Sequence, residues 1–164
     1  MRIAVAGARG QLGAAVVQAL ASGHEVVPLV HEDLDIADDH AVASAMERLR
    51  PAAIINCAAY NDVDGAEDHP VEALNVNAFG VRALAGGAAA VGAVFVHYGS
   101  DFVFDGTAAR PYTEDDRPDP RSVYAASKLL GEWFAADAPR WYVLRVESLF
   151  GHVPGGRPAK GSVA

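Results

Sequence analysis

The chain has 164 residues, of which 51% are hydrophobic and 21% are charged, a balance typical of one folded domain with a buried core. Its formal net charge of −8 at pH 7 argues against a nucleic-acid-binding protein, which usually presents a basic face. The single cysteine, Cys57, excludes an intrachain disulfide, and no segment approaches the ~20 apolar residues of a membrane span, so we expect a soluble cytoplasmic protein without membrane contacts.

Short apolar runs alternate along the chain with segments whose apolar residues recur at helical spacing. The predicted elements are, in order, a strand over residues 2–6, a helix over 11–22, a strand over 25–30, a helix from 38 or 39 to about 50, a strand over 53–56, a helix over 71–91, a strand over 94–98, a helix over 123–136 and a strand over 141–145. Gly86 and Gly87 weaken the far end of the third helix. This alternation predicts an α/β fold, a Rossmann-like doubly wound parallel sheet in three α/β/α layers.

A long polar stretch over residues 105–122, rich in proline, interrupts the alternation. A loop of this length inside a compact domain is usually functional. The stretch from Gly151 onward shows no periodicity and is predicted to be a loop or tail.

Three glycines, Gly7, Gly10 and Gly13, follow the first strand at once and open the first helix. In a dinucleotide site the first glycine permits the tight turn, the second lets a pyrophosphate approach the backbone, and the third lets the helix pack closely. The helix N-terminus would offer unpaired N–H groups to the phosphates. A glycine-rich turn that binds nothing is the alternative, but the position at the first crossover favours a dinucleotide.

The end of the second strand bears on the choice between NAD and NADP. An acidic residue there binds the ribose 2′-hydroxyl of NAD, but His31 stands at this position and Glu32 follows one step later. Arg9 in the glycine loop could pair with a 2′-phosphate or be a solvated loop charge. We therefore favour NADP(H), with NAD(H) as the alternative.

Tyr124 and Lys128 are four residues apart on a predicted helix, so their side chains share one face. A cation beside a phenol lowers its pKa toward neutrality, and such a phenol can give a proton to a carbonyl oxygen as a hydride arrives. Ser100 follows the fourth strand, at the edge where ligands bind in open α/β sheets. Its hydroxyl could hydrogen-bond the same carbonyl, or it could simply cap a turn.

Four segments carry a family resemblance: GARGQLG at 7–13, INCAAYNDVD at 55–64, SDFVFDG at 100–106 and YAASKLLGE at 124–132. On them the chain resembles the extended short-chain dehydrogenase/reductases, and within these the dTDP-4-dehydrorhamnose reductases. The resemblance implies NAD(P)H-dependent reduction of a 4-keto sugar nucleotide. Tyr124 would donate the proton, Lys128 would hold the nicotinamide ribose, and Ser100 would polarise the keto group.

The resemblance also implies a set of cofactor contacts. These are Gly7, Arg9, Gly10, Gln11, Leu12, Gly13, Asp35, Ile36, Asn56, Ala58, Ala59, Tyr60, Asn77, Tyr124 and Lys128. Two of them, Asn56 and Asn77, could equally be local backbone caps. The alanines of the third segment could serve packing alone.

The chain departs from the family pattern on the substrate side, at Gly99, Phe102 and Ser148. Family members also continue with a smaller C-terminal region that closes over the sugar nucleotide. We therefore predict an NAD(P)-binding domain over residues 1–150, and over 151–164 the start of a missing or truncated substrate-binding region.

Two other functions stay open on the same residues. One is a sugar-nucleotide epimerase or dehydratase, for which Asp101 is the available acid, and the other is a non-catalytic regulatory subunit that binds NADP. No metal is expected, because no histidine pair shows zinc-site spacing and the acidic residues at 62–68 are typical of a solvated loop. The last helix and strand are expected to be packed by Trp133, Phe134, Trp141 and Tyr142. The resemblance allows a homodimer through that helix and its neighbour.

Overall fold

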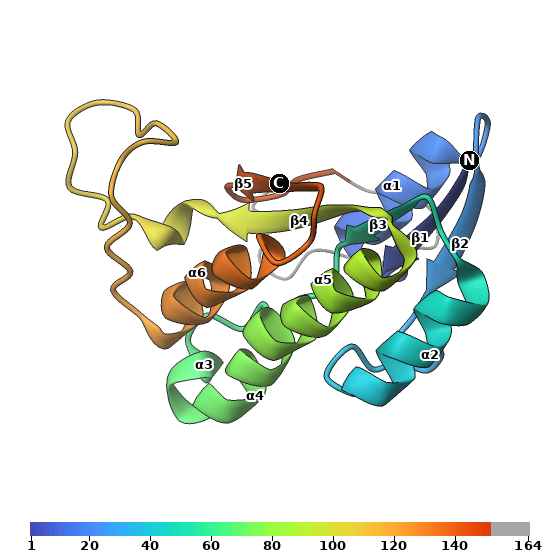
Figure 1. Cartoon of the computed structure of the whole chain (residues 1–164). Helices are drawn as coiled ribbons and strands as arrows, with labels where there is room; N and C mark the ends of the chain where they lie inside the picture. Colours follow the sequence, from blue (N-terminus) through green and yellow to red (C-terminus); the bar gives the residue numbers. More distant parts are fainter. Residues whose placement is uncertain (152–164) are drawn as a thin grey trace.

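Five parallel strands form the sheet in the computed structural model, which describes residues 1–151 (Figure 1). Their order across the sheet is β2-β1-β3-β4-β5, so the chain moves to one side of β1 first and then to the other. The strands are β1 (Arg2–Ala6), β2 (Glu25–Leu29), β3 (Ala53–Asn56), β4 (Val94–Ser100) and β5 (Trp141–Val146). The carboxyl ends of β1 and β3 are in register, with Ala6 beside Asn56.

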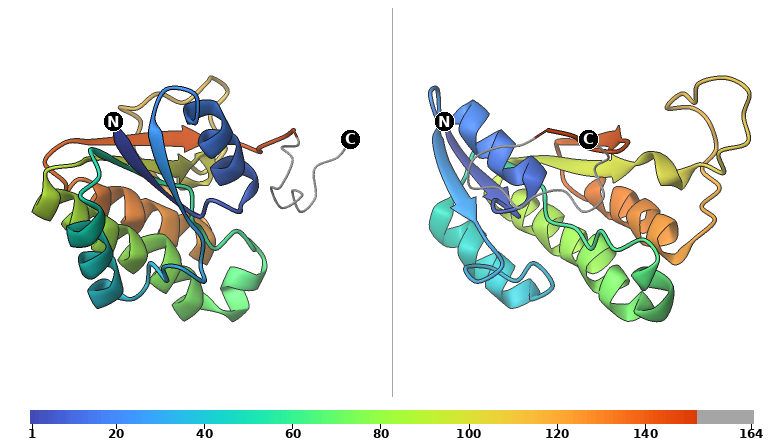
Figure 2. Two further views of the ribbon diagram at one scale, coloured as in Figure 1. Left: turned by 90° about the vertical axis from the view of Figure 1, so that its right-hand side faces the viewer. Right: turned by 180° about the vertical axis from the view of Figure 1, so that it is seen from behind.

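Helices cover both faces of this sheet, as the doubly wound fold requires (Figure 2). The helix α1 (Gln11–Leu20) packs against one face, where Val16 and Val17 meet Ile3 and Val5 of β1. The other face is covered by α2 (Asp39–Leu49), α5 (Gly80–Val91) and α6 (Val123–Ala135). The predicted three-layer Rossmann-like fold is confirmed.

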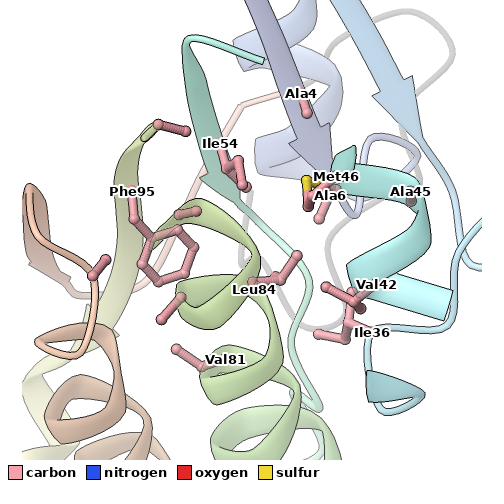
Figure 3. Packing of buried hydrophobic residues seen from close by; sticks show 14 of the residues in the cluster. Ala4, Ala6, Ile36, Val42, Ala45, Met46, Ile54, Val81, Leu84 and Phe95 are labelled. Carbon is pink, nitrogen blue, oxygen red and sulfur yellow. The ribbon is translucent and has the colours of Figure 1, made fainter. Parts of the chain in front are cut away.

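The main core lies between the sheet and the helices α2 and α5 (Figure 3). Alternate side chains of each strand point to this face, which gives the sheet its apolar side. The labelled contributors include Ala4, Ala6, Ile54 and Phe95 from the strands, Ile36, Val42, Ala45 and Met46 around α2, and Val81 and Leu84 from α5. This core fixes the strand ends that carry the candidate site.

The predicted helix over residues 71–91 is one helical run with an irregular middle. It consists of α4 (Pro70–Leu74), a π-helical turn η1 (Asn75–Phe79) and α5, and a short helix α3 (Gly65–Asp68) that we did not predict precedes it. The helix continues through Gly86 and Gly87 to Val91, and Gly87 packs tightly on α2, where a Cβ would lie 2.7 Å from Met46 Cγ. The run ends at Gly92, whose φ of +71° is the left-handed conformation of a helix cap.

The predicted long loop is confirmed. After β4 and a short 3-10 turn, η2 (Asp101–Val103), residues 105–122 contain no helix or strand, and Figure 1 shows this 105–122 loop projecting beyond β4. Apart from Gly151, the predicted tail over 151–164 lies outside the described residues. Within residues 1–151, no helix is long and apolar enough to cross a membrane.

The packing expected of the last aromatic residues is only partly present. Trp133 and Trp141 are 64% and 45% exposed, so the expectation that they pack the last helix and strand is wrong. Tyr142 and Leu144, on the face of β5 that α6 does not cover, are exposed as well. Phe134 does pack, with its ring centroid 6.1 Å from that of Phe79.

Candidate active site

The crevice between β1 and β3 is the switch point of the sheet, the position where open α/β folds bind dinucleotides. Gly7 turns the chain here with a φ of +72°, a conformation that favours glycine. A Cβ at Gly7 would lie 2.6 Å from the backbone nitrogen of Ala58, just after β3. The first glycine of the motif therefore permits both the tight turn and the close approach of the two loops.

The second and third glycines have different surroundings. A Cβ at Gly13 would overlap the carbonyl oxygen of Gly7, so α1 can pack this closely only with glycine there. Gly10 is the N-cap of α1, and its backbone nitrogen donates a hydrogen bond to the carbonyl oxygen of Gly7 at 2.9 Å. The first N–H groups of α1, from Gln11 onward, have no partner within the helix and can face an anion. This cradle fits the diphosphate of a dinucleotide.

Arg9, which leaves the cradle on the β2 side, forms an ion pair with Glu32. The Nη1···Oε1 distance is 2.8 Å, and both side chains are more than half exposed. The pKa of Glu32 is lowered mainly by a hydrogen bond from the backbone. The charge and the hydrogen bond of Arg9 lower it further. Of the residues predicted near the adenine, Asp35 is exposed, whereas the side chain of Ile36 is buried in the main core. Ile36 therefore offers a ligand its backbone rather than its side chain.

Asn56, at the end of β3, shapes the loop that faces Gly7. Its Oδ1 accepts a hydrogen bond from the backbone nitrogen of Ala58 at 3.0 Å, and its Nδ2 lies 3.2 Å from His97 Nδ1. His97 is fully buried, and burial, with a further contribution from Lys128, holds its pKa well below the usual value. A neutral imidazole accepts from the amide, so His97, which we had not singled out, positions Asn56.

Asn77 lies in the π-helical turn and bridges distant segments, so it is not a local cap. Its Oδ1 accepts from the backbone nitrogen of Tyr60 at 2.9 Å, and its Nδ2 donates to the Tyr60 carbonyl and to Ser127 Oγ, each at 3.0 Å. Ser127 in turn donates to the carbonyl of Tyr124 at 2.7 Å. The turn thus joins the loop after β3 to α6, consistent with the frequent occurrence of π turns at functional sites.

Ser100 and Tyr124 meet at the carboxyl edge of the sheet. Ser100 Oγ also accepts from the backbone nitrogen of Phe102 at 3.2 Å, so the serine both caps η2 and faces the site. Burial raises the pKa of Tyr124, and the interaction with Ser100 acts in the opposite direction and lowers it. The negative charge of Asp101 raises the pKa further. The expected lowering toward neutrality by Lys128 is therefore wrong in this structure.

Lys128 is turned away from the phenol. Its Nζ donates to the carbonyl oxygen of Tyr98 at 2.7 Å, and only 4% of the residue is exposed. Burial lowers the pKa of Lys128 to about 8, against the opposing effect of Glu132 one turn further along α6. The ammonium is still mainly charged at neutral pH.

We expect Lys128→Met to raise the free energy of unfolding at pH 7. Keeping the ammonium charged in this buried position costs about 3 kcal/mol, because its pKa is lowered from 10.5 to about 8. Above pH 8 the folded protein loses this proton while the unfolded chain keeps it, so the wild type gains stability as the pH rises to about 10. Urea unfolding of both proteins at pH 7 and pH 10 measures the difference. A stability gain that stays the same at both pH values would argue against a charge penalty at Lys128.

Gly99 has a direct structural explanation. A Cβ at Gly99 would overlap Glu132 Oε1, so this glycine makes room for a buried carboxylate under Ser100. Phe102 contacts Tyr124 edge-on with a centroid distance of 5.8 Å and is half exposed, and Ser148 is exposed. In the described part of the chain, no group of three or more His, Cys, Asp or Glu side chains could hold a metal ion.

The sequence is similar over most of its length to one family of proteins. The family model described as the RmlD substrate-binding domain matches residues 1–159. A dTDP-4-dehydrorhamnose reductase of Burkholderia thailandensis is 40% identical over 151 residues, which cover 92% of this chain and 51% of that protein. The chain thus spans about half the length of the curated relatives that it matches.

Solved structures show the same likeness. A dTDP-4-dehydrorhamnose reductase from Bacillus anthracis, solved in complex with NADP, has a TM-score of 0.90 at 34% identity, with 93% of this chain and 55% of that chain covered. A UDP-glucose 4-epimerase from Thermus thermophilus, in complex with NAD, has a TM-score of 0.81 at 25% identity and covers 88% of this chain and 54% of that chain. The sheet and its helices are therefore those of nucleotide-sugar enzymes that bind NAD or NADP.

Proposed function

This chain belongs to the family of the RmlD substrate-binding domain, and from that premise we propose that it provides the cofactor-binding and proton-donating part of a keto-sugar reductase. The reaction would be hydride transfer from NADPH to a 4-keto sugar nucleotide of the dTDP-4-dehydrorhamnose type. The observation that carries the proposal is the proximity of the Ser100 and Tyr124 side chains at the carboxyl edge of the sheet, with the buried ammonium of Lys128 on the same helix face.

The cofactor site is formed by the glycine cradle and the loops after β2 and β3. The residues that would hold the dinucleotide are Gly7, Arg9, Gly10, Gln11, Leu12, Gly13, Asp35, Ile36, Asn56, Ala58, Ala59, Tyr60, Asn77, Tyr124 and Lys128. The unpaired N–H groups of α1 suit the diphosphate, and the close backbone contacts at Gly7 and Gly13 hold the turn that presents them. When bound, the nicotinamide supplies the hydride.

The proton step belongs to Tyr124. A donor must keep its proton until negative charge develops on the substrate oxygen, and the raised pKa of Tyr124 ensures that it is protonated at neutral pH. Ser100 Oγ can donate to the same oxygen and hold it next to the phenol. Lys128, one turn further along the same face of α6, would hold the nicotinamide ribose.

Arg9 supports NADP(H) as the preferred cofactor, in line with the NADP complex of the Bacillus anthracis relative. The guanidinium of Arg9 forms an ion pair with Glu32. A 2′-phosphate that binds Arg9 would have to displace the Glu32 carboxylate or be repelled by its negative charge. NAD(H), which carries only hydroxyl groups there, would meet no such repulsion. Glu32 therefore moderates the preference that Arg9 creates.

We expect Glu32→Gln to increase NADPH affinity by about three- to tenfold relative to NADH, because the substitution removes a negative charge next to the 2′-phosphate. Fluorescence titration with each dinucleotide gives the two dissociation constants. Glu25→Gln is the matched control, since Glu25 forms a similar exposed pair with Arg2 at the amino ends of β1 and β2. An equal gain for NADPH and NADH in Glu32→Gln would contradict this role.

The decisive experiment for the function combines cofactor binding with turnover. The protein is incubated with NADPH and a panel of dTDP- and GDP-linked 4-keto sugars, and NADPH oxidation and sugar products are followed. We expect NADPH binding and oxidation dependent on a dTDP-linked keto sugar. We propose residues 1–150 as the cofactor domain and 151–164 as the start of the substrate-binding region. Binding of NADPH without oxidation by any sugar would instead favour a regulatory subunit.

An epimerase or dehydratase is the second candidate. Asp101 favours it, because this acid accepts a hydrogen bond from Ser100 Oγ at 3.2 Å and so lies next to the reacting position. The likeness to the Thermus thermophilus epimerase is compatible with the same scaffold. This function is tested with the oxidised dinucleotide and a nucleotide sugar that carries a 4-hydroxyl group, because it would change the sugar without net reduction of the dinucleotide.

We further propose a homodimer through α5 and α6. Trp133 is 64% exposed and Phe79 is 42% exposed, and Arg82 lies over the ring of Phe134 between them, 5.9 Å from its centroid. Exposed aromatic residues on neighbouring helical segments are typical of a subunit interface. Sedimentation of the wild type beside Trp133→Glu tests this, with a dimer expected only for the wild type.

A further inference from the structure

Arg145 of β5 lies between a buried carboxylate and an aromatic ring. Its guanidinium forms three hydrogen bonds with Glu132 of α6, at 2.8 to 3.1 Å. On its other side, the Cζ atom is 4.9 Å from the centroid of the Phe104 ring. Glu132 is 7% exposed, so Arg145 supplies the charge that this buried carboxylate requires.

The contacts continue from Phe104 into the 105–122 loop. Tyr112 stacks on Phe104 with a centroid distance of 4.3 Å and an interplanar angle of 5°. The Tyr112 hydroxyl donates to Asp105 at 2.6 Å and accepts from the backbone nitrogen of Ala108 at 3.1 Å. We call Arg145, Phe104 and Tyr112 the arginine–aromatic stack. It folds the first half of the projecting loop back onto the end of the sheet.

The other end of the stack meets the catalytic helix. Tyr124, Lys128 and Glu132 are spaced by four residues on one face of α6, and Glu132 fills the space beside Gly99, directly before Ser100. Arg145 therefore contacts both Glu132, under the proposed catalytic groups, and Phe104, on which Tyr112 of the loop stacks. A planar guanidinium can do both at once, whereas the compact ammonium of lysine cannot.

We propose that Arg145 is a positioning residue that holds the 105–122 loop against α6, so that this loop is ordered beside Ser100 and Tyr124 before a substrate binds. Fixing a loop of this length in advance removes part of the entropic cost of ligand binding. The ordering of the loop is a property of the chain itself. Its consequence for a sugar nucleotide rests on the proposed function.

Hydrogen exchange of the free protein tests the ordering directly. The informative amides are those of Thr107, Thr113 and Asp119, which are hydrogen-bonded inside the loop or at its base. Phe104→Leu removes the stack but keeps the Glu132–Arg145 pair, so folding should persist. We expect exchange in the peptide over 105–119 to rise about three- to tenfold in Phe104→Leu and in Arg145→Met.

Two further variants separate positioning from general damage. Phe104→Tyr keeps the ring and is expected to restore the exchange of the wild type, and Arg145→Lys is expected to behave like Arg145→Met. Arg2→Met is the matched control, because it removes an exposed arginine ion pair between β1 and β2. Loop exchange unchanged in Phe104→Leu, or raised equally in Arg2→Met, would overturn the proposal.

Ligand titrations show whether the loop serves the substrate. In Phe104→Leu we expect the affinity for dTDP, measured by calorimetry, to fall about tenfold while the NADPH affinity stays unchanged. Equal loss of both affinities would reject a positioning role on the substrate side. If the wild type bound no dTDP, the consequence for the substrate would be rejected for this chain, whereas the exchange experiment would still decide the ordering of the loop.

Discussion

Replacing Tyr124 by phenylalanine is expected to lower the rate of keto-sugar reduction by about 10²–10⁴-fold, the usual contribution of a general acid. The variant loses one hydroxyl group and keeps the ring that contacts Phe102, so the packing of α6 should persist. Single-turnover measurements with the protein in excess over the sugar nucleotide allow slow rates to be compared. NADPH affinity should remain within about twofold, because the glycine cradle is unaffected.

The size of this effect follows from where the proton is held. The phenol is buried next to Ser100, so a water molecule cannot easily replace it as the donor. Tyr142→Phe is the matched control, because Tyr142 is 62% exposed on β5 and should leave the rate unchanged. Equal rates for the Tyr124 variant and the wild type would remove the proposed proton donor and, with it, the reductase mechanism.

Local patterns were sufficient to predict most of the fold. The strand at Ala53–Asn56 was predicted with its observed bounds, and Asp38 caps α2 by accepting from the backbone nitrogen of Ala41 at 2.9 Å. Apolar runs, caps and glycine turns act over a few residues, so the sequence displays them directly. The π-helical turn at Asn75–Phe79 escaped prediction, because one extra residue per turn hardly changes the apolar spacing of a helix.

The candidate site was predictable only where its residues form a local motif. Ser100, Tyr124 and Lys128 belong to short recognisable segments. The hydrogen-bond partner of Lys128, however, is the backbone carbonyl of Tyr98, thirty residues away in the chain, and no side-chain pattern predicts it. His97, Glu132 and Arg145 carry no motif of their own. Their roles arise from tertiary contacts between β4, β5 and α6, and a folded structure is needed to see them.

The approach of α6 to the π-helical turn gives the second large prediction. Gly131 lies in the middle of α6, and a Cβ there would overlap the carbonyl oxygen of Asn77 and lie 3.4 Å from His97 Nε2. We expect Gly131→Ala to lower the free energy of unfolding by about 3 kcal/mol, since backbone atoms would have to move apart. Urea denaturation followed by circular dichroism measures this loss.

Gly86→Ala is the matched control, and its expected effect has the opposite sign. Gly86 also lies inside a helix, α5, but a Cβ there meets no atom within 4 Å. Alanine is the better helix former by about 1 kcal/mol, so this variant should be more stable than the wild type. If both variants were stabilised, α6 could not lie as close to η1 as described. The hydrogen bonds of Asn77 with Tyr60 and Ser127, which join the loop after β3 to α6, could then not form in this way.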